Sequence, residues 1–363
     1  MTAATLTATT TSSTETRLNN AGGKEIKSAA GFDLFPRPPR TAYDLYQDEK
    51  HTRRVSLGCP VLDATFRGGL PGHGVVEVSG MAGAGKTQLM LQLLVQQVRD
   101  AEAEWRRAKY ATPFVAGRSF YLSTEGPLPA KRLAEMAAAT CPEDSGFAQR
   151  VLESVIIVEA KNVEDQLYLL TTQLPSLLGD ASLGKIRLCV IDSMSALFRG
   201  EFSLSKGDTL ERAKMIFTMA KQMKRLSDRW GLPFVVTNQV TADFAAATFG
   251  VWEGGNADVV GDGVQPALGL SWSNCVHTRF LLSRRDANNL IPSFPTPGSN
   301  PPSNPATADA RSTGQSSRWI RHMRLLLSPS LPSNLSCRFV LETAGVRGVR
   351  RTELNEDGRP RER

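Results

Sequence analysis

One segment constrains the fold of this 363-residue chain more than any other: Gly80-Met81-Ala82-Gly83-Ala84-Gly85-Lys86-Thr87. A β-branched run precedes it at 75–79, and residues 88–98 after it carry leucines at helical spacing. A strand, a glycine-rich loop and a helix in this order form a phosphate cradle, because glycines let backbone N–H groups surround phosphate oxygens. The pattern therefore predicts a nucleotide site. Lys86 is expected to reach the β- and γ-phosphates, and the Thr87 hydroxyl is expected to bind Mg²⁺.

The remaining apolar runs indicate an α/β fold. Strand-like runs alternate with helical patterns, and they lie at 75–79, 118–122, 155–158, 187–191 and 234–237. Such alternation predicts a mainly parallel, twisted sheet flanked by helices, with right-handed crossovers. Two further runs, 324–327 and 338–341, predict a short β-rich C-terminal segment.

Composition shifts divide the chain into five parts. The expected parts are a disordered Thr-rich start and Pro-containing extended linker, an ATPase core, a disordered insertion rich in Pro, Ser and Asn, C-terminal strands that complete the core, and a basic tail. Their boundaries are 1–54, 55–286, 287–317, 318–348 and 349–363. The Thr-rich start also fits an organelle transit peptide, and the arginine-rich tail fits either a nuclear import signal or a solvated end.

Charge and cysteine content limit the class of partners. A formal net charge of +7 permits attraction to nucleic acid, although many soluble proteins carry a similar charge. The five cysteines show no C-x-x-C spacing, so neither a zinc site nor a disulfide framework is indicated. No run of 18 apolar residues occurs, so no membrane span is expected.

Three polar residues follow predicted strands where a phosphate-loop ATPase needs them. Asp192 ends an apolar strand and can orient the Mg²⁺ bound by Thr87, directly or through water. Glu125 ends another strand and is the candidate to activate the attacking water, although a solvent-facing glutamate would look the same. Gln239 follows a third strand, where it is either a sensor of the γ-phosphate or a buried amide that caps the strand.

The order of these motifs resembles the RecA-like recombinase core over about residues 55–285. The segments that carry the resemblance are Gly80–Thr87, Ser123-Thr124-Glu125-Gly126, Val190-Ile191-Asp192-Ser193 and Thr237-Asn238-Gln239-Val240. Further segments, 56–63, 196–202 and 266–274, narrow it to the eukaryotic strand-exchange paralogues. The chain departs from the pattern in two ways. Asn274 stands where the recombinase carries a histidine. Only about 54 residues precede the core, fewer than the helical N-terminal domain of many relatives needs.

The resemblance implies a RecA-like P-loop ATPase that acts in homologous recombination in the nucleus, with the cytoplasm and the mitochondrion as alternative locations. It implies slow, DNA-dependent ATP hydrolysis with Mg²⁺, catalysis by Glu125, Lys86 and Gln239, and an adenine contact by Arg132. It also implies three partners: a C-type recombinase paralogue in a heterodimer, the main strand-exchange recombinase, and single-stranded or branched DNA.

Two loops are expected to face DNA. The first, 199–209, offers Arg199 and Lys206 as phosphate contacts, and the second, 241–265, offers Phe244, Phe249 and Trp252 for base stacking. The second loop contains four acidic residues and no Lys or Arg, which predicts weaker DNA binding than a filament-forming recombinase shows. A scaffold with a structural nucleotide and an unrelated RecA-fold ATPase such as a replicative helicase are the alternative interpretations.

Overall fold

The computed structural model describes residues 16–18, 24–26, 41–50, 53–108, 117–201, 206–242, 264–286, 319–333 and 335–350. The chain divides into two compact units, 1–52 and 53–363. In the first unit, β1 (Thr16–Leu18) pairs antiparallel with β2 (Lys24–Ile26), and α1 spans Ala42–Lys50.

Helix α1 differs from the extended linker expected before residue 55. The helix begins at a capping box: the Thr41 backbone N–H donates to Asp44 Oδ2 at 3.0 Å, and the Asp44 N–H donates to Thr41 Oγ1 at 3.1 Å. These bonds satisfy backbone donors that a helix start otherwise leaves unpaired. The prolines before residue 40 dominated the sequence pattern and hid this local signal.

The second unit is built on one large mixed sheet. Its strand order is β14-β13-β12-β11-β5-β9-β8-β6-β7, with β10 paired to β9. Strands β11, β5, β9, β8, β6 and β7 run parallel, and β12, β13, β14 and β10 are antiparallel to their neighbours. The bounds are β5 Gly74–Gly80, β6 Arg118–Ser123, β7 Val155–Glu159, β8 Ile186–Asp192, β9 Pro233–Ala242, β10 Val264–Pro266, β11 Thr278–Asp286, β12 Trp319–Leu327, β13 Ser336–Glu342 and β14 Gly345–Val349. A separate pair joins β3 (Arg54–Val55) to β4 (Leu70–Pro71). The predicted α/β class with C-terminal strands is confirmed.

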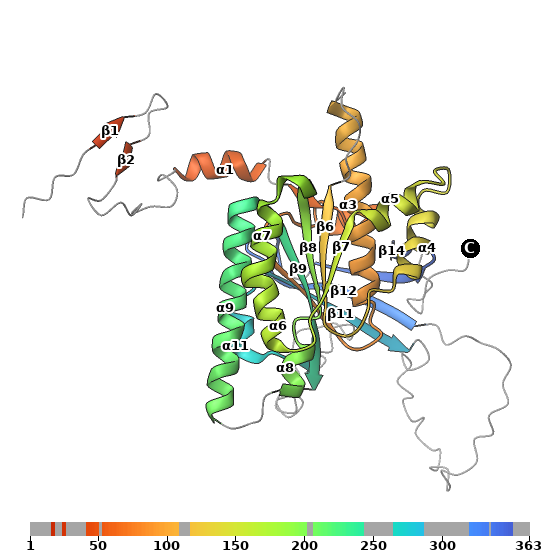
Figure 1. Ribbon diagram of the computed structural model, residues 1–363. Coiled ribbons are helices and arrows are strands. Elements are labelled where there is room, and N and C mark those ends of the chain that lie inside the picture. The colour runs from red at the N-terminus through yellow and green to blue at the C-terminus, as the bar shows by residue number, and fades with distance from the viewer. Residues whose placement is uncertain are drawn as a thin grey trace, which may run out of the picture. The chain divides into compact units, whose positions relative to one another are not determined.

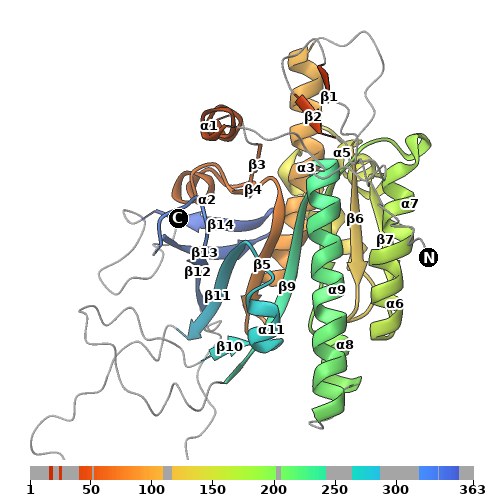
Figure 2. The ribbon, with the colours of Figure 1, turned by 90° about the vertical axis from the view of Figure 1, so that its left-hand side faces the viewer.

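Helices cover both faces of this sheet (Figures 1 and 2). One layer holds α2 (Pro60–Thr65), α3 (Lys86–Ala108), α4 (Ala130–Thr140) and α5 (Phe147–Glu153). The other holds α6 (Val163–Tyr168), the π-helix η1 (Leu169–Gln173), α7 (Leu174–Gly179), α9 (Lys206–Trp230) and α11 (Gly269–Ser273). The short helices η2 (Ala181–Leu183) and α8 (Ala196–Glu201) flank β8. No helix among the residues described is both long and apolar enough to cross a membrane.

The central strand β5 is buried on both faces, which explains why valines occur on both of them. Val76 and Val78 point into the core beneath α3, whereas Val75 points into the core beneath α9. The carboxyl ends of the parallel strands meet at one edge: Gly80 is in register with Gln239, and Ser123 with Asp192. Open α/β sheets bind their ligands at this edge.

Candidate nucleotide site

The phosphate loop joins β5 to α3. Gly83 and Gly85 have φ of 72° and 110°, a left-handed conformation that favours glycine. The Lys86 ammonium lies over the loop, where Nζ donates to the carbonyl oxygens of Gly80 at 2.8 Å and Met81 at 3.0 Å. The pKa of Lys86 is lowered from its usual value, because the effect of burial outweighs the opposite effect of the nearby negative charges of Asp192 and Glu125. The loop therefore holds a partly desolvated cation beside two carboxylates.

Asp192 is fixed at the end of β8 by two hydroxyl groups. Tyr121 donates its hydroxyl to Asp192 Oδ2 at 2.9 Å, and Thr237 donates to Oδ1 at 2.5 Å. Burial raises the pKa of Tyr121, and the charge of Asp192 raises it further, so the phenol stays protonated as a donor. The two donors come from β6 and β9, the strands on either side of β8.

The residues at this edge fit a magnesium ion that keeps most of its water. Among the residues described, no group of three or more His, Cys, Asp or Glu could hold a metal. Mg²⁺ is commonly held by one or two protein oxygens together with phosphates and water. Thr87, in the first turn of α3, and the oriented carboxylate of Asp192 are of the type and number that such a site needs, and their role as ligands stays a prediction.

Glu125 and Gln239, predicted separately from two strand ends, meet in the structure. Glu125 Oε1 accepts hydrogen bonds from Gln239 Nε2 at 3.0 Å and from Ser193 Oγ at 2.7 Å. The Glu125 side chain is 45% exposed, so water reaches the carboxylate. Ser193 ends the motif Val190-Ile191-Asp192-Ser193, but its hydrogen bond to Glu125 was not predicted from the sequence. Glu125 and Gln239 can together position a water molecule and change their contacts when a phosphate binds nearby.

Arg199, expected at DNA, lies beside this pair. Its Nη1 donates to Gln239 Oε1, and its Nη2 lies 3.9 Å from Glu125 Oε1. In this structure the guanidinium is therefore part of the edge of the nucleotide site. Its contact with DNA stays a prediction.

Arg132, predicted to contact adenine, lies beside the first turn of α3. Its Nε donates to Gln88 Oε1 at 2.9 Å, and its Nη2 donates to the Glu342 carbonyl oxygen at 2.7 Å. It also forms a partly exposed ion pair with Glu135 at 3.6 Å. These contacts tie the helix that follows the phosphate loop to the end of β13, and the adenine contact stays a prediction.

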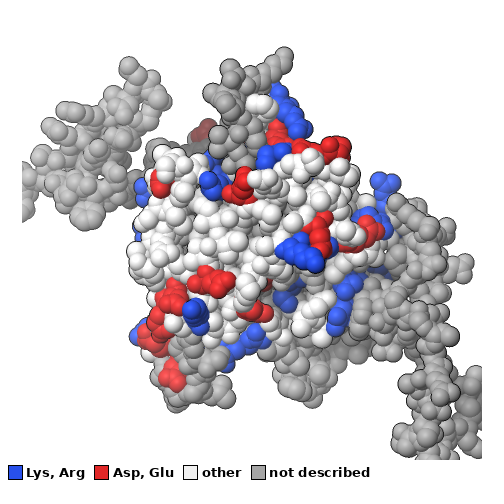
Figure 3. All heavy atoms as spheres, turned by 45° about the vertical axis from the view of Figure 1, so that its right-hand side comes forward, with Lys and Arg blue, Asp and Glu red and all other residues white. Residues whose placement is uncertain are grey.

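The other predicted DNA contacts are only partly described. Lys206 begins α9, whereas Phe244, Phe249 and Trp252 lie outside the described residues. On the face drawn in Figure 3, Lys and Arg lie interspersed with Asp and Glu, without one broad basic patch among the described residues. That face carries no sign of a strong electrostatic footprint for nucleic acid.

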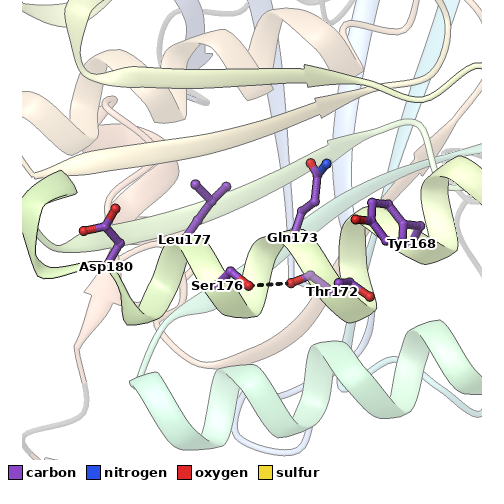
Figure 4. A pocket seen from close by; sticks show the side chains of 6 residues that line it. All are labelled: Tyr168, Thr172, Gln173, Ser176, Leu177 and Asp180. Atoms are coloured by element: carbon purple, nitrogen blue, oxygen red, sulfur yellow. Dashed lines mark hydrogen bonds between the residues drawn. The ribbon is translucent and has the colours of Figure 1, made fainter.

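A hollow of about 290 Å³ lies on the outer side of η1 and α7 (Figure 4). It is lined by Tyr168, Thr172, Gln173, Ser176, Leu177 and Asp180. None of the predicted nucleotide or DNA residues lines it, so it is separate from the candidate nucleotide site.

A buried polar network behind the phosphate loop was not predicted. Glu77 of β5 is 0% exposed, and its Oε1 accepts from Asn238 Nδ2 at 2.6 Å and from Trp272 Nε1 at 3.1 Å. Its Oε2 forms an ion pair with Arg279. The network joins β5, β9, β11 and α11, and Asn238 directly precedes Gln239. A glutamate inside the apolar run 75–78 was the signal for it.

Comparisons with known proteins point to one family. The Rad51 family model matches residues 49–282. The DNA repair protein XRCC3 of Mus musculus is 30% identical over 90% of this chain and 85% of its own length. The XRCC3 homolog of Arabidopsis thaliana is 29% identical over 82% of this chain and 93% of its own length. The DNA repair and recombination protein RadA of Methanococcus maripaludis is 30% identical over 64% of this chain and 69% of its own length.

Proposed function

The chain belongs to the Rad51 family, and on that premise we propose that it is an XRCC3-like, ATP-binding recombinase paralogue. It acts in homologous recombination repair of double-strand breaks and stalled forks, and it hydrolyses ATP slowly. The observation that carries the proposal is the meeting of Glu125 and Gln239 at the edge where the phosphate loop begins. A carboxylate for water and an amide that can sense phosphate are the parts that such a site needs.

Each residue of the site has a distinct role in the proposed hydrolysis. The backbone N–H groups of residues 80–85 and the Lys86 ammonium bind the phosphates of ATP. Thr87 and Asp192 hold Mg²⁺, which when bound neutralises charge on the phosphates. Glu125 orients the attacking water, and Gln239 holds Glu125 and reports the nucleotide state to the segment that follows β9. Arg132 contacts the adenine.

The proposed protein partners follow from the resemblance to XRCC3. The chain forms a heterodimer with a C-type recombinase paralogue, and the pair assists the main strand-exchange recombinase on single-stranded or branched DNA in the nucleus. Arg199 and Lys206 contact phosphates of the DNA, and Phe244, Phe249 and Trp252 stack on bases. The low basic content of 241–265 supports a role as a mediator rather than as a filament-forming recombinase.

A scaffold that uses its nucleotide only for structure is the second candidate, and Asn274 favours it. A histidine at that position is part of the nucleotide-gated switching implied for the recombinase. A scaffold would still bind ATP, but its repair function would not depend on hydrolysis.

Lys86→Ala tests the proposal. We expect this variant to lose binding of fluorescent ATP and to fail in recombination repair when it replaces the natural chain in its own cells. Lys161→Ala, which removes an exposed lysine far along the chain from the loop, is the control. Normal repair by a Lys86→Ala protein that no longer binds ATP would refute a role for ATP. Stoichiometric co-purification with another Rad51-family chain is expected, and recovery of the chain alone would contradict the heterodimer.

A further inference from the structure

The carboxyl end of β9 carries polar side chains on both faces of the sheet. Val235 belongs to the core beneath α3, and Val236 belongs to the core beneath α9. Because successive side chains of a strand point to opposite faces, Thr237 and Gln239 lie on the α3 face, and Asn238 lies on the α9 face. The two residues that bond to the carboxylates of the nucleotide site therefore share one face, and Asn238 holds the same backbone from the other.

Strand β9 leaves β8 just before the residues that face the site. Among the residues described, the ladder between these two strands ends at Val236. Beyond it, the Met194 N–H donates to the Thr237 carbonyl oxygen at 2.9 Å, and the Ala267 N–H donates to the Gln239 carbonyl oxygen at 2.9 Å. Strand β5 stays paired with β9 as far as Gln239. On the side of β8, the strand end is therefore positioned by single bonds rather than by a continuous ladder.

Asn238 is not the residue that stability alone would place at this position. It is 0% exposed, and asparagine is depleted in strands. Its Nδ2 donates to Glu77 Oε1 at 2.6 Å, and this orientation of the amide is unambiguous because a carboxylate can only accept. Its Oδ1 is buried and has no hydrogen-bond partner among the residues described, which costs stability. An apolar β-branched residue would avoid that cost, so the amide serves the bond to Glu77.

Glu77 is a rigid acceptor for this bond. Its Oε1 also accepts from Trp272 Nε1 at 3.1 Å, and its Oε2 forms an ion pair with Arg279. Asn238 is in register with Ser79, so Glu77 is its diagonal neighbour on the same face of β5. The bond therefore joins the strand of the predicted phosphate sensor to the strand that leads into the phosphate loop.

We propose that Asn238 is a positioning residue for ATP hydrolysis, and that it acts through its two neighbours in β9. Its bond to Glu77 fixes the strand end from the face opposite the nucleotide site, so that Gln239 and Thr237 reach the two carboxylates of that site. The inference rests on the proposed ATP hydrolysis and adds a residue that touches neither nucleotide nor water. Rates are sensitive to small misplacements of reacting groups, whereas ATP is held mainly by the phosphate loop, so loss of the bond lowers the rate and spares the affinity.

Asn238→Ala in the full-length chain tests the proposal by single-turnover hydrolysis of ATP with Mg²⁺, at a temperature well below its unfolding midpoint. We expect hydrolysis about tenfold slower than in the natural chain, with the affinity for fluorescent ATP changed less than about twofold. The control is Arg279→Met, which breaks the ion pair at the other oxygen of Glu77 and leaves the bond to Asn238 in place. This control unfolds more readily, yet it hydrolyses ATP at the natural rate. A merely structural role predicts that the rate follows stability in both variants, and that result overturns the inference.

Two double variants test the same bond from the side of Glu77, and they decide the matter if Asn238→Ala does not fold. Both Glu77→Gln/Arg279→Met and Glu77→Met/Arg279→Met remove the two buried charges, but only the first keeps an acceptor for Asn238. We expect the natural rate of hydrolysis in the first and a rate about tenfold lower in the second. Equal rates in the two variants overturn the inference. A natural chain that hydrolyses no ATP refutes the proposed function itself, so the two failures are distinct.

Discussion

The buried Glu77–Arg279 pair offers the sharpest test of how this sheet is held together. Arg279→Met removes the cation from a carboxylate that is 0% exposed, while the Arg279 side chain itself is only 12% exposed. Breaking a buried pair in this way typically costs about 3–5 kcal/mol, because it leaves an uncompensated buried charge. The donors of Asn238 and Trp272 still lie within 3.1 Å of Glu77 Oε1, so part of the carboxylate charge stays compensated. We therefore expect the free energy of unfolding to fall by an amount at the lower end of this range, about 3 kcal/mol.

Equilibrium unfolding in urea measures this loss as a shift of the midpoint at constant slope. The double variant Glu77→Gln/Arg279→Met removes both charges and keeps an amide that accepts from Asn238 and Trp272. We expect it to be more stable than Arg279→Met alone, because replacing both partners of a buried pair is often nearly neutral. Two results would refute the reasoning. One is a loss of unfolding free energy below about 1 kcal/mol in Arg279→Met, and the other is a loss in the double variant equal to the sum of the losses in its two single variants.

Two further predictions concern the site and its surroundings. Ser193→Ala removes one of the two hydrogen-bond donors to Glu125. We expect ATP hydrolysis to slow about tenfold, while ATP affinity in a fluorescent-nucleotide titration stays unchanged. Unchanged hydrolysis would show that Ser193 does not position the carboxylate. Burial lowers the pKa of His277 below its usual 6.5, aided by Lys224, and its Nδ1 accepts the Val75 N–H at 3.0 Å. The unfolded chain then takes up the proton first, so the free energy of unfolding should fall as pH drops below about 6.5. His277→Asn, which keeps an acceptor but does not titrate, should flatten this dependence in urea midpoints measured from pH 5 to 7.5, and an unchanged slope would contradict the assignment.

Local signals made the geometry of the sheet edge beside the phosphate loop predictable. The strand, glycine loop and helix around Lys86 are adjacent in sequence, and Asp192 directly ends an apolar run. Because the carboxyl ends of parallel strands meet at one edge, the approach of Gln239 to Glu125 follows from topology. These features depend on a few neighbouring residues and on one general rule of α/β sheets.

Features that depend on pairing between distant strands were not predictable. One example is the pairing of Arg284 in β11 with Arg321 in β12. The long segment 287–318 separates the two strands, so the sequence does not indicate their register. Glu77 interrupts an apolar run, but its partners come from residues more than 150 positions away. Helix α1 was missed for the opposite reason: its signal was local, but neighbouring prolines outweighed it.

Single-turnover ATP hydrolysis by Glu125→Gln tests the central claim most directly. The neutral amide keeps the size of the side chain and its contact with Gln239, but it cannot accept a proton from water. We expect ATP binding equal to that of the natural chain and hydrolysis at least about a hundredfold slower. Glu159→Gln, at the end of the neighbouring strand β7 and in register with Ser123, is the matched control and should hydrolyse ATP normally. Equal hydrolysis by Glu125→Gln and the natural chain would contradict the account.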